Sequence, residues 1–173
     1  DHAGHLYGPD SQEVNDNLVK IDQTIGQLVQ GLKQRGIKAN LVIVSDHGMA
    51  ATSSDRVVAL NKILDPSLYH VVTGGAYAGI APSSGHSLKD LEPLFASHDH
   101  MQCWPKQQIP ARFHYGQNPR VPAVICAAEV GWSIMGDNSM AAHATKGNHG
   151  YDNQTPEMGA LFIANGPAFQ KHK

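Results

Sequence analysis

The feature that most constrains the fold of this chain is a short apolar run that ends abruptly in polar residues. The run, Leu41–Val44, has the length and the β-branched content of a strand that is buried on both faces. Asp46 and His47 follow it, and Gly48 then allows the backbone to turn away. Open α/β sheets present functional side chains just beyond the carboxyl ends of their strands. The sequence therefore predicts an α/β fold with a candidate site at the end of this strand.

Asp46 and His47 fit two interpretations. Neighbouring residues face opposite sides of a regular strand, but in a turn a carboxylate oxygen and an imidazole nitrogen can bind one zinc-like cation. In the other interpretation, the pair is a strand end with a capping aspartate and a surface histidine. The pair alone does not decide between them, so the rest of the chain has to.

Length and composition exclude several classes of protein. The chain has 173 residues, of which 41% are hydrophobic and 16% charged, so it can form one globular domain with a core. Its net charge is −2 and it has no basic block, so nothing indicates binding to a nucleic-acid polymer. No apolar run approaches the roughly 18 residues that are needed to span a membrane.

Residues 10–35 carry the clearest helical pattern. Asp10 can cap this helix, with Glu13 as the reciprocal partner of a capping box, and Gly36 is expected to end it. The apolar residues recur at spacings of three and four and form one stripe: Val14, Leu18, Ile21, Ile25, Leu28, Val29 and Leu32. We expect this stripe to pack on one face of a sheet.

The middle of the chain, residues 51–140, is predicted to be a small α+β insertion. Its predicted elements are short and bounded by turn residues: a helix or strand at 57–64, a hairpin of strands at 69–73 and 76–81, a helix at 87–97, and extended segments at 101–104, 111–115 and 121–127. The remaining residues, 1–50 and 141–173, would then form the core of the domain.

The two cysteines, Cys103 and Cys126, are not in a CxxC motif, so a thiolate metal site is not indicated. They flank two predicted strands, and both a disulfide and two free buried thiols are compatible with the sequence. His98 and His100 flank Asp99, but no further ligand type lies near them in the sequence. We therefore expect these two histidines to have a structural or surface role.

Two further stretches combine acidic or imidazole side chains with glycine. Asp1 and His5 are four residues apart, so on a helical turn they share a face and can reach one ion. His149 lies in a glycine-rich loop that leads to another apolar run, residues 159–165, predicted as a buried strand. The combined set suits zinc rather than calcium or magnesium, since it supplies two carboxylates and three imidazoles: Asp1, His5, Asp46, His47 and His149.

Three motifs in this order carry a resemblance to a known family: Asp1-x-x-Gly4-His5-x-x-Gly8-Pro9, Val44-Ser-Asp46-His47-Gly48-Met49 and Gly147-Asn148-His149-Gly150-Tyr151-Asp152. They resemble the nucleotide pyrophosphatase/phosphodiesterases (type I phosphodiesterases) of the alkaline phosphatase superfamily. Residues 109–115 and 160–167 are also similar, so the resemblance runs nearly from end to end. It implies an alkaline-phosphatase-like α/β fold with a largely parallel sheet sandwiched by helices.

The resemblance also implies a chemistry. It implies a hydrolase of phosphodiester or pyrophosphate bonds that uses two zinc ions and a phospho-enzyme intermediate. Asp1, His5 and His149 would bind the first zinc, and Asp46 and His47 would bind the second. The nucleophilic threonine or serine of the family precedes the residue that matches Asp1. We therefore expect this chain to be part of a longer domain, to lack the nucleophile and to be inactive alone.

The resemblance implies a small phosphodiester or nucleotide as the substrate and a periplasmic, secreted or cell-surface location, with which two cysteines are compatible. Two alternatives stay open. One is a related phosphomonoesterase or sulfatase of the same superfamily, and the other is a metal-binding domain or pseudo-enzyme without catalysis. The sequence does not identify the substrate.

Overall fold

The computed structural model describes residues 1–137 and 145–170, and its first elements are two helices. Helix α1 is His2–Tyr7 and helix α2 is Gln12–Gln34. The side chain of Ser11 caps α2 by accepting a hydrogen bond from the backbone N–H of Val14 at 3.3 Å. The predicted cap was Asp10, which lies one residue too early because residues 8–11 form turns before the helix starts. Gly36, with φ of +68°, follows the helix as predicted.

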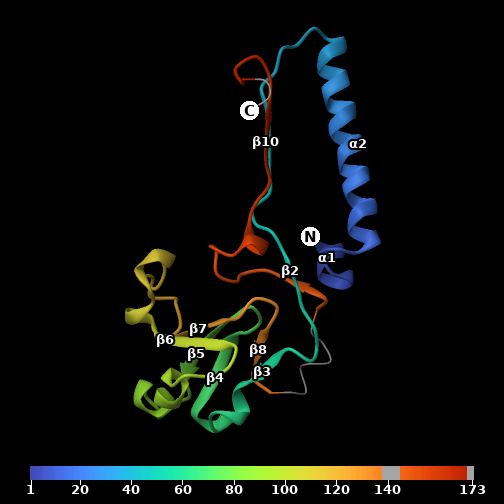
Figure 1. Ribbon diagram of the computed structural model, residues 1–173. Helices are drawn as coiled ribbons and strands as arrows, with labels where there is room; N and C mark the ends of the chain where they lie inside the picture. The colour runs from blue at the N-terminus through green and yellow to red at the C-terminus, as the bar shows by residue number, and fades with distance from the viewer. Residues whose placement is uncertain (138–144, 171–173) are drawn as a thin grey trace.

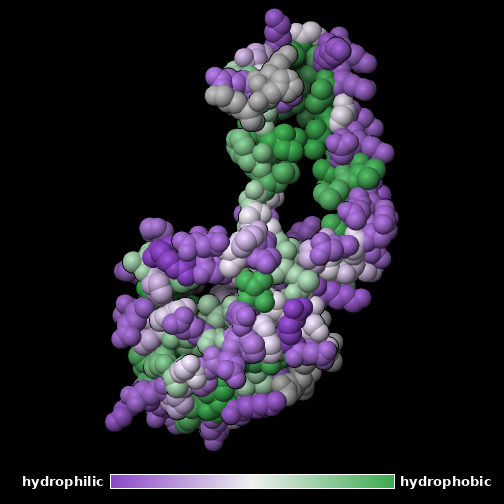
Figure 2. Space-filling view, in the orientation of Figure 1, coloured by the Kyte–Doolittle hydropathy of each residue, from purple (hydrophilic) through white to green (hydrophobic). Residues whose placement is uncertain are grey.

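The apolar stripe of α2 is largely exposed, contrary to our expectation that it packs on a sheet. The helix has no buried residue, and Leu18, Leu28 and Val29 are 43–55% exposed. Its main contacts are with α1. In Figure 2, the apolar side chains of α2 face those of a two-stranded ladder, residues 41–44 and 162–165, across open space. The periodicity identified the helix and its apolar face, but no described element covers that face.

The ladder consists of β1 (Leu41–Val44) and β10 (Phe162–Asn165), which pair in antiparallel register along their whole length (Figure 1). Both strands were predicted to be buried. That prediction is wrong for the described chain, in which Val44 is 63% and Phe162 69% exposed. A two-stranded ladder with no described layer on either face cannot bury its side chains. Ser45 and Asp46 follow β1, so the turn that carries Asp46 and His47 lies at the carboxyl end of this strand, as predicted.

We call residues 52–137 the lobe, and this lower part of the molecule in Figure 1 is built on a four-stranded antiparallel sheet. The strand order is β4 (Tyr69–Thr73), β5 (Tyr77–Pro82), β7 (Val124–Ala128) and β6 (Met101–Pro105). The predicted hairpin is confirmed as the antiparallel pair β4 and β5. The predicted extended segments at 101–104 and 121–127 correspond to β6 and β7.

Two further pairs of strands are short. Strand β2 (Ala50–Ala51) pairs antiparallel with β9 (Gly147–Asn148), and β3 (Val57–Ala59) pairs parallel with β8 (Ser133–Met135). Among the described strands, β3 and β8 form the one parallel pair. The largely parallel sheet that we expected is therefore not seen among these strands, most of which pair antiparallel.

Short 3-10 helices fill the connections: η1 (Leu60–Lys62), η2 (Pro66–Leu68), η3 (Leu88–Phe95), η4 (Lys106–Gln108), η5 (Ala111–Phe113) and η7 (Pro156–Met158). The predicted helix at 87–97 is thus 3-10 in type, with Pro93 inside it. The prediction of an extended segment at 111–115 is wrong. Pro110 fixes a backbone that enters a 3-10 turn, and His114 ends that turn with φ of +48°.

The core lies in the lobe, and Cys103 and Cys126 are joined there by a disulfide between directly opposed positions of β6 and β7. The largest fully buried side chains are Leu60, Ile80, Leu91, Leu94, Val124, Cys126 and Ile134. Tyr151 and Met158, from the C-terminal part of the chain, belong to the same core. The boundary that we predicted between residues 140 and 141 lies outside the described residues.

Candidate metal centre

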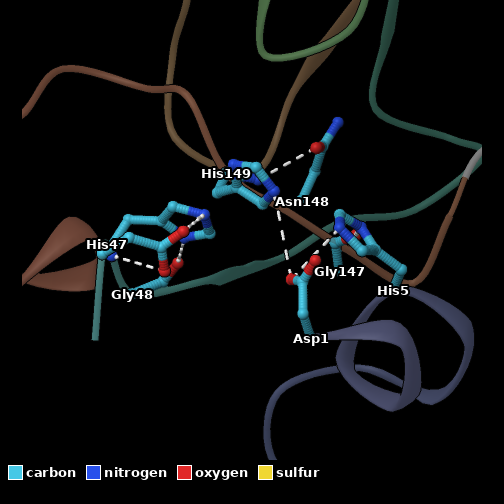
Figure 3. A network of polar contacts seen from close by, with 8 residues as sticks. Asp1, His5, His47, Gly48, Gly147, Asn148 and His149 are labelled. Atoms are coloured by element: carbon cyan, nitrogen blue, oxygen red, sulfur yellow. Dashed lines mark hydrogen bonds and ion pairs between the residues drawn. The ribbon is translucent and has the colours of Figure 1, made fainter. Parts of the chain in front are cut away.

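Three predicted ligands from distant parts of the chain meet in space. Asp1 stands at the start of α1, His5 lies on that helix, and His149 directly follows β9. A ligand atom of each lies within 4.8 Å of the other two. The Asp1 Oδ1 atom is 3.4 Å from Nε2 of His5 and 4.0 Å from Nε2 of His149 (Figure 3). No second cluster of three histidine, cysteine or acidic side chains occurs within residues 1–137 and 145–170.

The imidazole of His5 is oriented by a backbone carbonyl. Its Nδ1 lies 2.8 Å from the carbonyl oxygen of Gly147. Because a carbonyl oxygen can only accept, Nδ1 donates this hydrogen bond, and Nε2 is the ring nitrogen that faces Asp1. Metal-bound histidines usually have this arrangement, in which the second ring nitrogen donates to a carbonyl or carboxylate.

Close packing of glycines brings α1 against the strand that precedes His149. A Cβ atom added to Gly147 would lie 2.4 Å from the carbonyl oxygen of Gly4 and 2.8 Å from Sδ of Met49. The backbone N–H of Lys146 also donates to the carbonyl of His5 at 2.8 Å. A side chain larger than hydrogen at position 147 would separate His5 from His149.

Asp46 and His47 lie in a turn beyond β1. The Nε2 atom of His47 is 3.4 Å from Oδ2 of Asp46, and its Nδ1 is 2.8 Å from the carbonyl oxygen of Gly48. As for His5, Nδ1 donates to a backbone carbonyl, and Nε2 is the ring nitrogen that faces the carboxylate. The N–H of Gly48 donates to the carbonyl of Met158 at 3.2 Å, which holds the turn in place.

The two groups of predicted ligands adjoin through a histidine stack. The rings of His47 and His149 are stacked with their centres 3.7 Å apart, and the ring of His5 is 5.1 Å from that of His149. Burial, together with the nearby imidazoles of His47 and His5, lowers the pKa of His149. This favours the neutral imidazole, which is the form that binds a metal.

The donor atoms fit a zinc ion at the first position. One carboxylate and two imidazoles are a usual ligand set for a zinc ion whose fourth position is open to water or substrate. At the second position, the described residues supply one carboxylate and one imidazole. An open groove of about 1020 Å³ runs from Asp1, Asp46 and His47 along the first half of α2, where Leu18 and Ile21 line it.

His98 and His100 lie outside this cluster, as expected. His98 contacts the carbonyl of Pro93 at 2.9 Å. The Nδ1 atom of His100 is 2.6 Å from Oε2 of Glu129, and its ring stacks on Trp132. Both histidines thus have partners within the lobe.

The sequence did not indicate the groups that hold the ligands. The carbonyls of Gly48 and Gly147 have no sequence signal, because every residue has a carbonyl. Arg112 and Asp152, which form an ion pair near His149, both lie in stretches that resembled the family. Nothing in their spacing, 40 residues apart, showed that they meet.

Comparison with known proteins agrees with the motifs. The family model for type I phosphodiesterase / nucleotide pyrophosphatase matches residues 1–152. Bis(5'-adenosyl)-triphosphatase ENPP4 of Bos taurus is 40% identical over 174 residues, and ectonucleotide pyrophosphatase/phosphodiesterase family member 5 of Homo sapiens is 36% identical. These matches cover 99% of the chain but 38% and 36% of the two relatives, so the chain spans less than half of their length.

Solved structures show the same relationship. Human ectonucleotide pyrophosphatase/phosphodiesterase 5 superposes with a TM-score of 0.87 at 36% identity, over 98% of this chain and 45% of that one. An inactive variant of the murine protein in complex with AMP superposes with a TM-score of 0.88 at 35% identity, over 98% of this chain and 46% of that one. The expected alkaline-phosphatase-like α/β fold is confirmed by these likenesses. The chain belongs to the type I phosphodiesterase / nucleotide pyrophosphatase family of hydrolases.

Proposed function

We propose that this chain supplies the metal-binding part of a zinc-dependent hydrolase that cleaves phosphodiester or pyrophosphate bonds. One observation carries the proposal: ligand atoms of Asp1, His5 and His149 lie within 4.8 Å of one another. Three such atoms can bind a single zinc ion through bonds of about 2 Å each. Asp46 and His47 are proposed to contribute to a second zinc ion.

The chain's own residues have defined roles in this proposal. Bound zinc polarises a phosphoryl oxygen and lowers the pKa of a bound water. Asp1 contributes negative charge to the site, and the carbonyl of Gly147 keeps the lone pair of His5 directed at the ion. The lowered pKa of His149 keeps its imidazole neutral and available as a ligand.

We propose a nucleotide or other small phosphodiester as the substrate. The relative from Bos taurus is named a bis(5'-adenosyl)-triphosphatase, and a murine relative was solved in complex with AMP. The groove beside Asp46 and His47 is lined by both polar and apolar residues. This suits a nucleotide, which combines a charged phosphate with a largely apolar nucleobase. No described helix is long and apolar enough to cross a membrane.

We propose an extracellular or cell-surface location. The relatives include proteins named as ectonucleotide pyrophosphatases, and Cys103 and Cys126 form a disulfide. Disulfides persist in secreted and surface proteins and are rare in the reducing cytosol.

Zinc titration of the metal-free chain tests the metal assignment. We expect one tightly bound zinc, detected by competition with a chromogenic chelator. His149→Ala should abolish the tight site because it removes one of three ligands, whereas Asp46→Ala should leave it nearly intact. His70, an exposed histidine on β4, provides the matched control, and His70→Ala should bind zinc as the unmodified chain does.

Hydrolysis of an activated phosphodiester is the second measurement. We expect the isolated chain to be no faster than the zinc background, since no nucleophile has been assigned in it. Robust turnover that is lost with Asp46→Ala would show that the second site assembles within this chain alone. That result would contradict our expectation that the chain is inactive alone.

A further inference from the structure

The loop that carries His149 is fastened to the lobe just after the histidine. Tyr151 and Asp152 both contact residues that are distant in sequence. The hydroxyl of Tyr151 reaches the backbone of Trp132, 19 residues away, and the carboxylate of Asp152 reaches Arg112, 40 residues away. On its other side, the loop is fixed by the pairing of β9 with β2.

Tyr151 anchors the loop in the core. Its side chain is 6% exposed, and its hydroxyl donates to the carbonyl of Trp132 at 2.9 Å. Burial raises the pKa of this phenol to about 12, so it remains a neutral donor at physiological pH. Gly150, with φ of +97°, makes the turn that sends His149 toward Asp1 and Tyr151 into the core.

Arg112 orients the loop from the outside. Its Nη1 donates to Oδ1 of Asp152 at 2.8 Å, and its Nη2 donates to Oδ2. Two parallel hydrogen bonds between a guanidinium and a carboxylate fix direction as well as distance. Arg112 is itself positioned by Phe113, since its Cζ lies 4.0 Å from the centre of that ring.

The ion pair is suited to positioning rather than to global stability. Both side chains are partly exposed, at 42% for Arg112 and 31% for Asp152. Solvent screens ion pairs that are exposed to this extent, so they contribute little to folding. The N–H of His149 donates to the side chain of its neighbour Asn148, which is a local bond and does not tie the loop to another element. The direction of the His149 ring therefore depends on its stack with His47 and on how the residues on both sides of it are held.

We propose that Arg112 is a positioning residue for the first metal site, acting through Asp152 on the backbone that presents His149. The inference rests on the proposed zinc site and extends it to a residue of the lobe that contacts no predicted ligand. Groups that orient metal ligands typically change metal affinity by about 10–100-fold when they are removed. Loss of the two parallel hydrogen bonds from Arg112 to Asp152 should accordingly weaken zinc binding far more than it lowers the stability of the fold.

The test compares Arg112→Ala, Asp152→Asn and Arg112→Lys with the unmodified 173-residue chain. Zinc affinity is measured by chelator competition, and Tm is measured on the metal-free protein. We expect Arg112→Ala and Asp152→Asn to bind zinc about tenfold more weakly with little change in Tm. Arg112→Lys keeps the positive charge but cannot form two parallel hydrogen bonds, so its zinc affinity should lie between those of Arg112→Ala and the unmodified chain. Arg120→Ala, at an exposed arginine of the same segment, is the control and should match the unmodified chain.

Hydrogen exchange of residues 147–152 in the metal-free chain is the second readout. We expect faster exchange there in Arg112→Ala than in Arg120→Ala. Zinc affinity of Arg112→Ala within twofold of the unmodified chain would overturn the inference, whatever its Tm. If the unmodified chain binds no zinc tightly, the proposed function fails instead, and unchanged exchange in Arg112→Ala would then refute the positioning role. Should Arg112→Ala not fold, the near-isosteric Asp152→Asn decides both readouts.

Discussion

At the scale of single residues, the candidate centre depends on groups that a sequence does not display. The types and spacing of Asp1, His5 and His149 led to a predicted zinc site, and the structure brings these three side chains together. The orientation of the His5 and His47 rings could not be predicted. It comes from the carbonyls of Gly48 and Gly147, whose positions depend on the tertiary fold.

Gly147→Ala tests whether close packing sets this geometry. The added methyl group would lie 2.4 Å from the carbonyl oxygen of Gly4, so the strand and α1 must separate. We expect a loss of about 1–3 kcal/mol in the free energy of unfolding, as is typical of overpacking, together with weaker zinc binding. Urea unfolding and chelator competition measure the two effects.

Gly26→Ala is the matched control. Gly26 lies in the exposed helix α2, and a Cβ atom there would meet no atom within 4 Å. Alanine should therefore be neutral or stabilise the chain by up to about 1 kcal/mol. Equal and small effects of the two substitutions would show that the approach of β9 to α1 is not tight.

At the scale of elements, the sequence predicted local structure better than burial. The helix at 12–34, the hairpin of β4 and β5, and the strands β1, β6 and β7 all occur close to their predicted positions. Periodicity and β-branched content report how a segment can present its apolar groups. They do not report whether another element is present to cover them, and α2, β1 and β10 are exposed in the described chain.

A pair of leucine substitutions distinguishes the two kinds of apolar position. Leu91 in η3 is fully buried, whereas Leu28 in α2 is 54% exposed. We expect Leu91→Ala to cost about 2–5 kcal/mol in the free energy of unfolding. Leu28→Ala should change it by about 0.5 kcal/mol or less. A large cost for Leu28→Ala, measured by urea unfolding, would show that the stripe of α2 is covered in solution.

At the scale of the whole molecule, the lobe and the metal centre form one connected unit. The core of the lobe includes Tyr151 and Met158, which belong to the part of the chain that carries His149. Family motifs predicted the fold class because they fix the order of the ligand-bearing segments. They could not predict how the lobe contacts the site, since the Arg112–Asp152 pair joins residues 40 positions apart through tertiary structure.

X-ray absorption spectroscopy at the zinc edge is the most direct test of the central claim. For the chain loaded with one equivalent of zinc, we predict a first shell of nitrogen and oxygen at about 2.0–2.1 Å that includes two imidazoles. His149→Ala should lose one imidazole from this shell. A shell without imidazole, or one that His149→Ala leaves unchanged, would contradict the claim that Asp1, His5 and His149 bind one zinc ion.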